Sequence, residues 1–112
     1  MYQGYEVKES DWKLFRKKIS GWQENYMGKL VHEYIDMLSD DEKNPSDRFW
    51  TLEKRIKADK RDVGVIAEMS RSKMYGNLIG LIDEGAITLD DLSEFSEELQ
   101  EKLRFVFREN RE

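Results

Sequence analysis

Apolar residues recur at intervals of three and four residues along the first third of this chain. They form one stripe on a helix, made of Trp12, Phe15, Ile19, Trp22, Tyr26, Leu30, Tyr34 and Leu38. A helix of roughly 28 residues is about 42 Å long at 1.5 Å per residue. A compact domain of about 100 residues has a radius of gyration of only about 13 Å. We therefore expect part of this helix to project beyond its own core.

The polar run Ser39–Pro45 should end this helix, because a proline ring cannot continue it. A second helix is expected from Ser46. Its pattern lapses between Asp59 and Gly64, which predicts a turn or a kink. A third helix is expected from Val65 to Glu84, apolar on several sides and therefore central and buried.

Two signals define the last third of the chain. Gly85 suits the left-handed residue that ends a helix. Thr88 and Asp91 have the spacing of a capping box, and an apolar stripe follows from Leu89 to Val106. Because Ser96 can cap a fresh start, we expect a short helix followed by a longer one.

No segment alternates apolar and polar residues for long enough to predict a strand. The fold class is therefore all-α, a small bundle of four to five helices with one long N-terminal helix. With 112 residues there is room for one core. The predicted organisation is an N-terminal tail over residues 1–9 and a single helical domain over residues 10–112.

Composition excludes several classes of protein. The chain has no cysteine, which excludes disulfides and thiolate chemistry and favours a cytosolic setting. No apolar run resembles a signal peptide, and none approaches the roughly 20 residues that a membrane helix needs. We predict a cytoplasmic location and no membrane partner.

Catalysis is not expected. His32 is the one histidine, and a metal site usually needs three or four converging ligands. No phosphate-binding loop, nucleophile elbow or dinucleotide fingerprint is present. The prediction is no enzyme, with no catalytic residue, no metal, no cofactor and no evident small-molecule substrate.

The aromatic part of the long stripe is the first candidate interaction site. Its members keep the three-four step of a coiled-coil seam and are Trp12, Phe15, Ile19, Trp22 and Tyr26. A second copy of the chain, or another protein, would cover a projecting stripe, and symmetric dimers are the commonest assembly. The alternative is that the other helices of the same chain cover it.

A basic stretch is the second candidate site. Residues 48–73 carry eight basic and four acidic groups, between two acidic ends. The candidate contacts for nucleic acid or an acidic partner are Arg48, Lys54, Arg55, Lys57, Lys60 and Arg61. A solvated, salt-bridged helix face is the alternative. The acidic region from Asp83 to Glu112 leaves a third option, an inhibitor that mimics nucleic acid.

The segment Ile66–Ile87 is similar to the end of a winged helix-turn-helix, with a serine-rich helix followed by a leucine-isoleucine pattern and glycine. The motif's turn between Ile66-Ala67 and the recognition helix is missing, however. One continuous helix is the simpler interpretation.

Four runs of the chain together resemble a group of short, uncharacterised proteins of Firmicutes and their mobile elements. These runs are His32–Ile35, Phe49–Ile56, Gly85–Leu92 and Phe95–Leu99. Members of the group often carry the label of multidrug transporter, which the lack of any membrane-spanning segment contradicts. The resemblance implies no catalytic residues.

The leading hypothesis is a non-enzymatic helical interaction protein, dimeric, acting as a small bacterial or mobile-element regulator. The alternative is a nucleic-acid-binding regulator that uses the basic region 48–73.

Overall fold

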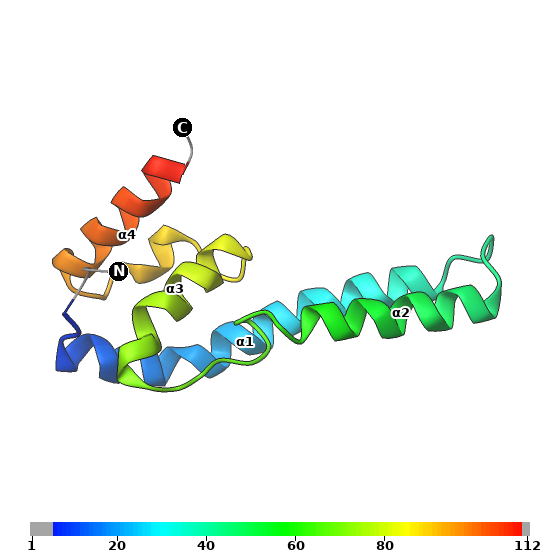
Figure 1. Ribbon diagram of the computed structural model, residues 1–112, viewed down its shortest axis with the longest axis horizontal. Helices are drawn as coiled ribbons and strands as arrows, with labels where there is room; N and C mark the ends of the chain where they lie inside the picture. Colours follow the sequence, from blue (N-terminus) through cyan, green and yellow to red (C-terminus); the bar gives the residue numbers. More distant parts are fainter. Residues whose placement is uncertain (1–5, 111–112) are drawn as a thin grey trace.

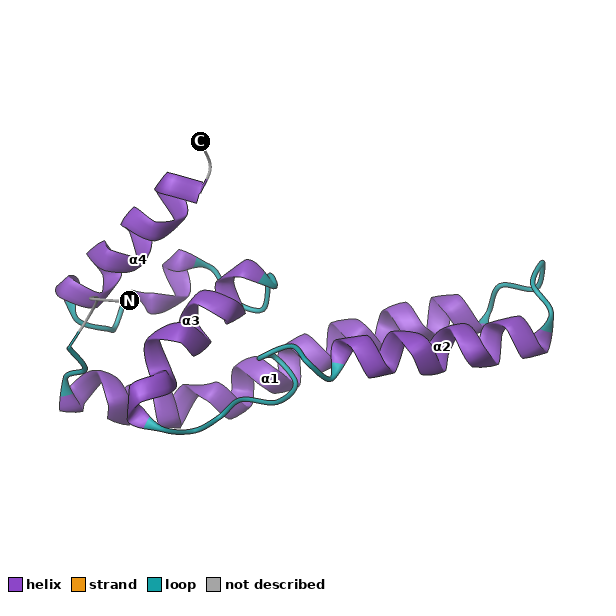
Figure 2. Cartoon of the chain, viewed as in Figure 1, coloured by secondary structure: helices purple, strands orange, loops and turns teal. Residues whose placement is uncertain are grey.

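The computed structural model describes residues 6–110, and all of their regular structure is helical (Figures 1 and 2). The predicted all-α class and long N-terminal helix are confirmed. Residues 1–5 of the predicted tail and residues 111–112 lie outside the described range. The elements are α1 (Glu9–Leu38), α2 (Pro45–Asp59), the 3-10 turn η1 (Arg71–Lys73), α3 (Met74–Asp83), the 3-10 turn η2 (Leu89–Leu92) and α4 (Glu97–Asn110).

The molecule has two parts, a lobe and an arm (Figure 1). In the lobe, α3, η2 and α4 pack on the first half of α1. In the arm, which we define as residues 27–60, the second half of α1 runs beside α2 as a two-helix hairpin. The principal extents are 51 × 33 × 26 Å, and the radius of gyration is 16.8 Å. A compact domain of this size would have about 13 Å, so the arm projects well beyond the lobe.

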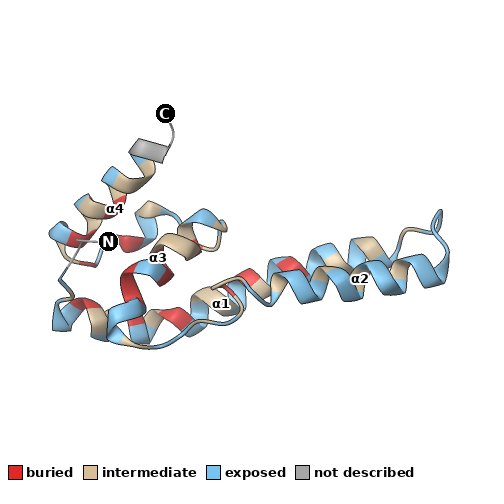
Figure 3. Ribbon diagram, in the orientation of Figure 1, coloured by how far each residue is buried: buried red, intermediate tan, exposed pale blue. Residues whose placement is uncertain are grey.

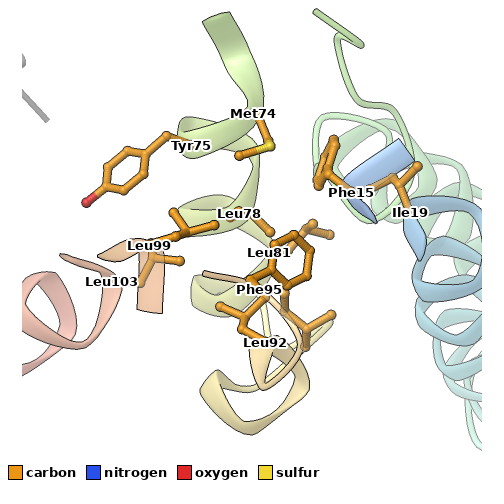
Figure 4. Close-up of a cluster of buried hydrophobic side chains, with 11 residues drawn as sticks. Phe15, Ile19, Met74, Tyr75, Leu78, Leu81, Leu92, Phe95, Leu99 and Leu103 are labelled. Carbon is orange, nitrogen blue, oxygen red and sulfur yellow. The ribbon is translucent and has the colours of Figure 1, made fainter. Parts of the chain in front are cut away.

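The lobe contains the hydrophobic core (Figure 4). The indole of Trp22 lies against this core, with ring centroids 6.4 Å from Phe15 and 6.3 Å from Phe95. These contacts join α1 to the segment that precedes α4. The buried members of the core come from every lobe element except η1 and are Phe15, Ile19, Met74, Tyr75, Leu78, Leu81, Ile87, Leu92, Phe95, Leu99 and Leu103.

A buried carboxylate holds the start of α4 against the start of α1. Asp11 is only 2% exposed, and it accepts hydrogen bonds from the backbone N–H of Ser96 at 2.8 Å and from its hydroxyl at 2.6 Å. The Ser96 hydroxyl oxygen in turn accepts from the N–H of Leu99 at 3.3 Å, which caps the helix as predicted. A carboxylate at a helix N-terminus is favoured by the helix dipole, so this burial is stabilised by charge as well as by hydrogen bonds.

The turns between α3 and α4 follow the expected chemistry. Gly85 has φ +81°, and the N–H groups of Gly85 and Ala86 donate to the carbonyls of Ile82 and Leu81, which is the Schellman pattern. The Thr88 N–H donates to the Asp91 carboxylate at 2.8 Å, completing the capping box at η2.

The predicted third helix was wrong over its first part. Residues 66–70 have no regular secondary structure, and the helix proper begins at Met74. The reason is topological: α2 returns only to the middle of α1, while α3 starts near the beginning of α1, so the chain has to span the distance between them (Figure 1). Asn77 helps to hold the span by donating its side-chain amide to the Glu68 carbonyl at 3.0 Å. The helix-turn-helix interpretation needs Ile66 and Ala67 to lie in a helix, and they do not, so this interpretation is also wrong.

The base of the arm is fixed to the lobe at Val63 and Gly64. The carboxylate of Glu84, the residue that follows α3, accepts both of their N–H groups, at 2.9 and 3.0 Å. From α1, the Gln23 amide donates to the Val63 carbonyl at 2.9 Å, and the Tyr26 ring packs against Gly64. This junction has no room for a side chain at position 64.

Substitution of Gly64 by alanine should therefore destabilise the fold. A Cβ at this position would lie 2.6 Å from Cγ of Tyr26, and overpacking of this kind costs about 1–3 kcal/mol. The matched control is Gly28→Ala, where a Cβ meets no heavy atom within 4 Å and alanine should stabilise the helix by about 1 kcal/mol. Urea unfolding of both variants measures the difference. Equal effects, or a more stable Gly64→Ala chain, would contradict the packing at this junction.

Candidate functional site

The seam that holds the arm together is largely polar. The Arg55 guanidinium donates to Glu33 and, at 2.9 Å, to Asp59. Asp59 also accepts the hydroxyl of Tyr34 at 2.6 Å, and the guanidinium lies 5.7 Å from the centre of the Tyr34 ring. At the tip, Arg48 donates to the carbonyls of Lys43 and Leu38, where α1 ends. Hydrogen bonds and ion pairs thus join the two helices, beside the buried Leu30 and the partly buried Met37 and Leu52.

This polar seam shifts the pKa values of its members. Burial, and then the hydrogen bond to Asp59, raise the pKa of Tyr34 to about 12. The hydrogen bond to Glu33 raises the pKa of Arg55 above its already high value. At the base of the arm, burial and a 2.5 Å hydrogen bond to Asp62 raise the pKa of Tyr26. At neutral pH, Tyr34 and Tyr26 therefore stay neutral and able to donate, and Arg55 stays positively charged.

The polar seam leaves large apolar side chains of the arm in solvent. None of the residues of α2, all of which the structure describes, is buried (Figure 3). We call five of the exposed apolar residues the arm face, with exposed fractions that run from 37% at Ile56 to 61% at Phe49. Its members are Val31, Ile35, Leu38, Phe49 and Ile56.

The arm face lies on one side of the hairpin. On α1, Leu30, Tyr34 and Met37 are the more buried row, and Val31, Ile35 and Leu38 each follow one position later, a rotation of about 100°.

On α2, Arg48, Leu52 and Arg55 are the less exposed row that faces α1, and Phe49 and Ile56 again follow one position later. The two helices run in opposite directions. A step of one residue along each chain, a rotation of about 100°, therefore turns the exposed apolar row of α1 and that of α2 toward the same side of the hairpin. An exposed apolar surface of this kind marks a site of interaction.

The predicted aromatic stripe lies at the other end of α1 and is covered by the chain itself. Phe15 and Ile19 are buried in the lobe core, and Tyr26 is buried at the junction. Trp12 and Trp22 are partly buried and pack against the core. The structure thus adopts the alternative in which other helices of the same chain cover the stripe.

The predicted basic residues separate into two groups. Arg48 and Arg55 are engaged inside the arm by the hydrogen bonds of its seam and tip. Lys54, Lys57, Lys60 and Arg61 are exposed. Of these four, Lys57 has an ion pair among the described residues, with Glu53 at 3.8 Å.

An exposed tryptophan accompanies the exposed cations. Trp50, Lys54 and Lys57 follow one another in steps of four and three residues on the outer side of α2, away from α1. Arg61 lies four residues further on, in the turn after the helix. Trp50 is one of the most exposed large apolar residues in the described chain. The strip combines positive charge with an aromatic ring.

His32 and the C-terminal acidic groups are the remaining titratable candidates in the described chain. His32 is exposed on α1, and no cluster of three or more His, Asp or Glu side chains within residues 6–110 has the geometry of a metal site. Among the C-terminal acidic groups, Glu94 pairs with Lys18 and Glu98 pairs with Lys8, so part of this charge is neutralised within the lobe. The ion pair also lowers the pKa of Glu94.

Comparison with known proteins adds no identification. No protein-family model, curated protein or solved structure matches the chain. The resemblance to short proteins of Firmicutes therefore stays a prediction. Of the described helices, none combines the length and the apolar character that crossing a bilayer requires.

The arm seam should weaken in alkali. Because the pKa of Tyr34 is raised from 10 to about 12 by folding, its contribution to stability is complete below pH 10 and is lost as the pH rises from 10 to 12. At pH 8, Tyr34→Phe should cost about 1 kcal/mol, the value of one hydrogen bond. The difference from wild type should shrink toward zero near pH 12, as measured by urea unfolding. A difference that stays constant with pH would show that the phenol does not donate to Asp59.

Proposed function

We propose that this chain is a non-enzymatic helical interaction protein that forms a homodimer through the arm face. Its biological role would be that of a small regulator, encoded by a bacterium or a mobile element. The arm is the interface, rather than the aromatic stripe of the lobe.

The observation that carries this proposal is the exposed apolar row on both helices of the arm. Val31, Ile35, Leu38, Phe49 and Ile56 lie on one side of a hairpin whose own seam is polar. Burial of a large apolar side chain contributes roughly 1.5–3 kcal/mol. A hairpin without a third helix cannot obtain that energy within one chain. A second hairpin would supply the missing layer and complete a four-helix arrangement.

Association of the wild-type chain should depend on concentration, and Phe49→Ser should weaken it. The matched control is Phe105→Ser, because Phe105 on α4 is 57% exposed, close to the 61% of Phe49, but lies in the lobe. Sedimentation velocity over about 1–100 µM should give a dimer for wild type and for Phe105→Ser. A wild-type chain that is monomeric throughout, or a loss of the dimer in Phe105→Ser alone, would contradict the proposal.

A second candidate function is the binding of nucleic acid along the outer side of α2. The observation that favours it is the strip of Trp50, Lys54, Lys57 and Arg61, since stacking on an exposed ring and contact with phosphates are the two components of single-strand recognition. The chain carries a net charge of −5, which opposes it.

This candidate predicts binding of a fluorescent single-stranded oligonucleotide that falls steeply with added salt, because bound phosphates release counterions. Reversal of charge in the triple variant K54E/K57E/R61E should abolish the binding, as followed by fluorescence anisotropy. R48E is unsuitable as a control, because Arg48 closes the arm tip. R104E, on the lobe, serves instead. Binding that is insensitive to salt or equally reduced by R104E would contradict this use of the strip.

A further inference from the structure

Acidic and basic residues occupy different parts of the arm. Residues 36–48, around the tip, carry five acidic and two basic groups, and one of the basic groups, Arg48, pairs with Asp41 at the tip. Residues 49–61, which return toward the base, carry five basic and two acidic groups. One arm is therefore acidic at its tip and basic along the helix that leads back to the lobe.

Two identical arms can meet face to face about a two-fold axis in two ways. In a parallel pair the tips lie together, so that acidic groups face acidic groups. In an antiparallel pair each tip lies over the base of the other arm, so that unlike charges meet. Juxtaposition of like charges across an interface costs several kcal/mol, whereas complementary charges select partner and register.

We infer that the arm face binds a second copy of this chain in the antiparallel orientation. Asp41 and Glu42 of each tip then lie near Lys57 and Lys60 of the partner. This inference rests on the proposed dimer and specifies its geometry. Lys57 and Lys60 are 12 and 15 positions beyond Pro45, which places them about 18–22 Å from the tip along α2. The two arms overlap over that length.

The apolar residues of α2 fit the same orientation. Phe49 and Ile56 are two helical turns apart on the arm face, and Lys60 lies one further turn toward the base. A two-fold axis midway between Phe49 and Ile56 places Phe49 beside Ile56 of the partner subunit. The same axis brings Lys60 level with the start of α2 of the partner, where the acidic tip begins.

The size of the face sets the strength of the dimer. Two helices of about 10 Å width and about 22 Å length present roughly 440 Å² in projection. Standard interfaces bury about 800 Å² per partner. This one covers about half of that area, so a weak dimer with a dissociation constant in the micromolar range is expected. With so small an apolar area, the exposed charges at the rim contribute a measurable share, and added salt weakens the dimer.

A charge-reversal exchange tests the orientation. The tip-reversed variant D41K/E42K is basic at both ends of the arm, and the base-reversed variant K57E/K60E loses the positive base. Each alone should dimerise at least about tenfold more weakly than wild type, because like charges meet. An equimolar mixture should form a heterodimer within about threefold of the wild-type constant, since every contact is again complementary. Sedimentation velocity and native mass spectrometry measure both quantities.

A cysteine at the tip gives a second measurement that does not depend on charge. The chain has no cysteine of its own, so Asn44→Cys introduces a single thiol at the tip. In the antiparallel dimer the two thiols lie at opposite ends and should not form an intermolecular disulfide under mild oxidation. A disulfide-linked Asn44→Cys dimer, charge variants that each dimerise alone as strongly as wild type, or a mixture of them that stays as weak as each alone, would overturn the orientation and leave the dimer itself intact. A wild-type chain that remains monomeric would instead overturn the proposed function. Circular dichroism verifies that each variant is folded.

Discussion

Helix α1 is about 45 Å long, and the lobe covers only its first half. Because α1 is longer than the lobe that packs on it, the two halves of this helix have different surroundings. The half within the lobe carries the aromatic residues that α3, η2 and α4 bury. The other half has a single helix beside it, so the apolar residues that do not face α2 remain in solvent. The junction at Val63 and Gly64, held by Glu84, Gln23 and Tyr26, marks the boundary between the two halves.

The chemistry of the arm seam explains how a two-helix hairpin persists beyond the lobe core. Arg55 connects Glu33 on α1 to Asp59 on α2, and Tyr34 donates to the same carboxylate. Interactions of this type hold geometry and register but contribute little net stability at a surface. The arm therefore depends on the lobe for its base. In the proposed dimer, it also depends on a second chain to cover its apolar side.

Much of the fold follows from local patterns. The length of the first helix, the break at Pro45, the left-handed Gly85 and the Thr88–Asp91 box all have short-range causes, and the structure has them where they are expected. The non-helical segment 66–70 was not predicted, because its cause is the distance between α2 and α3. That distance is fixed by tertiary packing. The role of Asp11 at the start of α4 was missed for the same reason, since its partner Ser96 is 85 residues away.

The candidate site was only partly predictable. The expectation that part of the first helix projects is met, but the projecting half is the C-terminal one, because three later elements pack on the N-terminal half. A second apolar row was present in the sequence at Met27, Val31 and Ile35, one position after Tyr26, Leu30 and Tyr34, and it meets the main stripe at Leu38. Two rows on one helix predict two packing partners, and the second partner is not found within the described residues 6–110.

The most direct test of the interface is hydrogen exchange of the α2 amides as a function of protein concentration. If the arm face is buried between two chains, exchange in Pro45–Asp59 should slow as the concentration rises through the dissociation constant. Amides of α3, in the lobe core, should be unaffected. Exchange of α2 that is the same in dilute and concentrated samples would contradict the proposed dimer and would mean that the arm stands alone in solution.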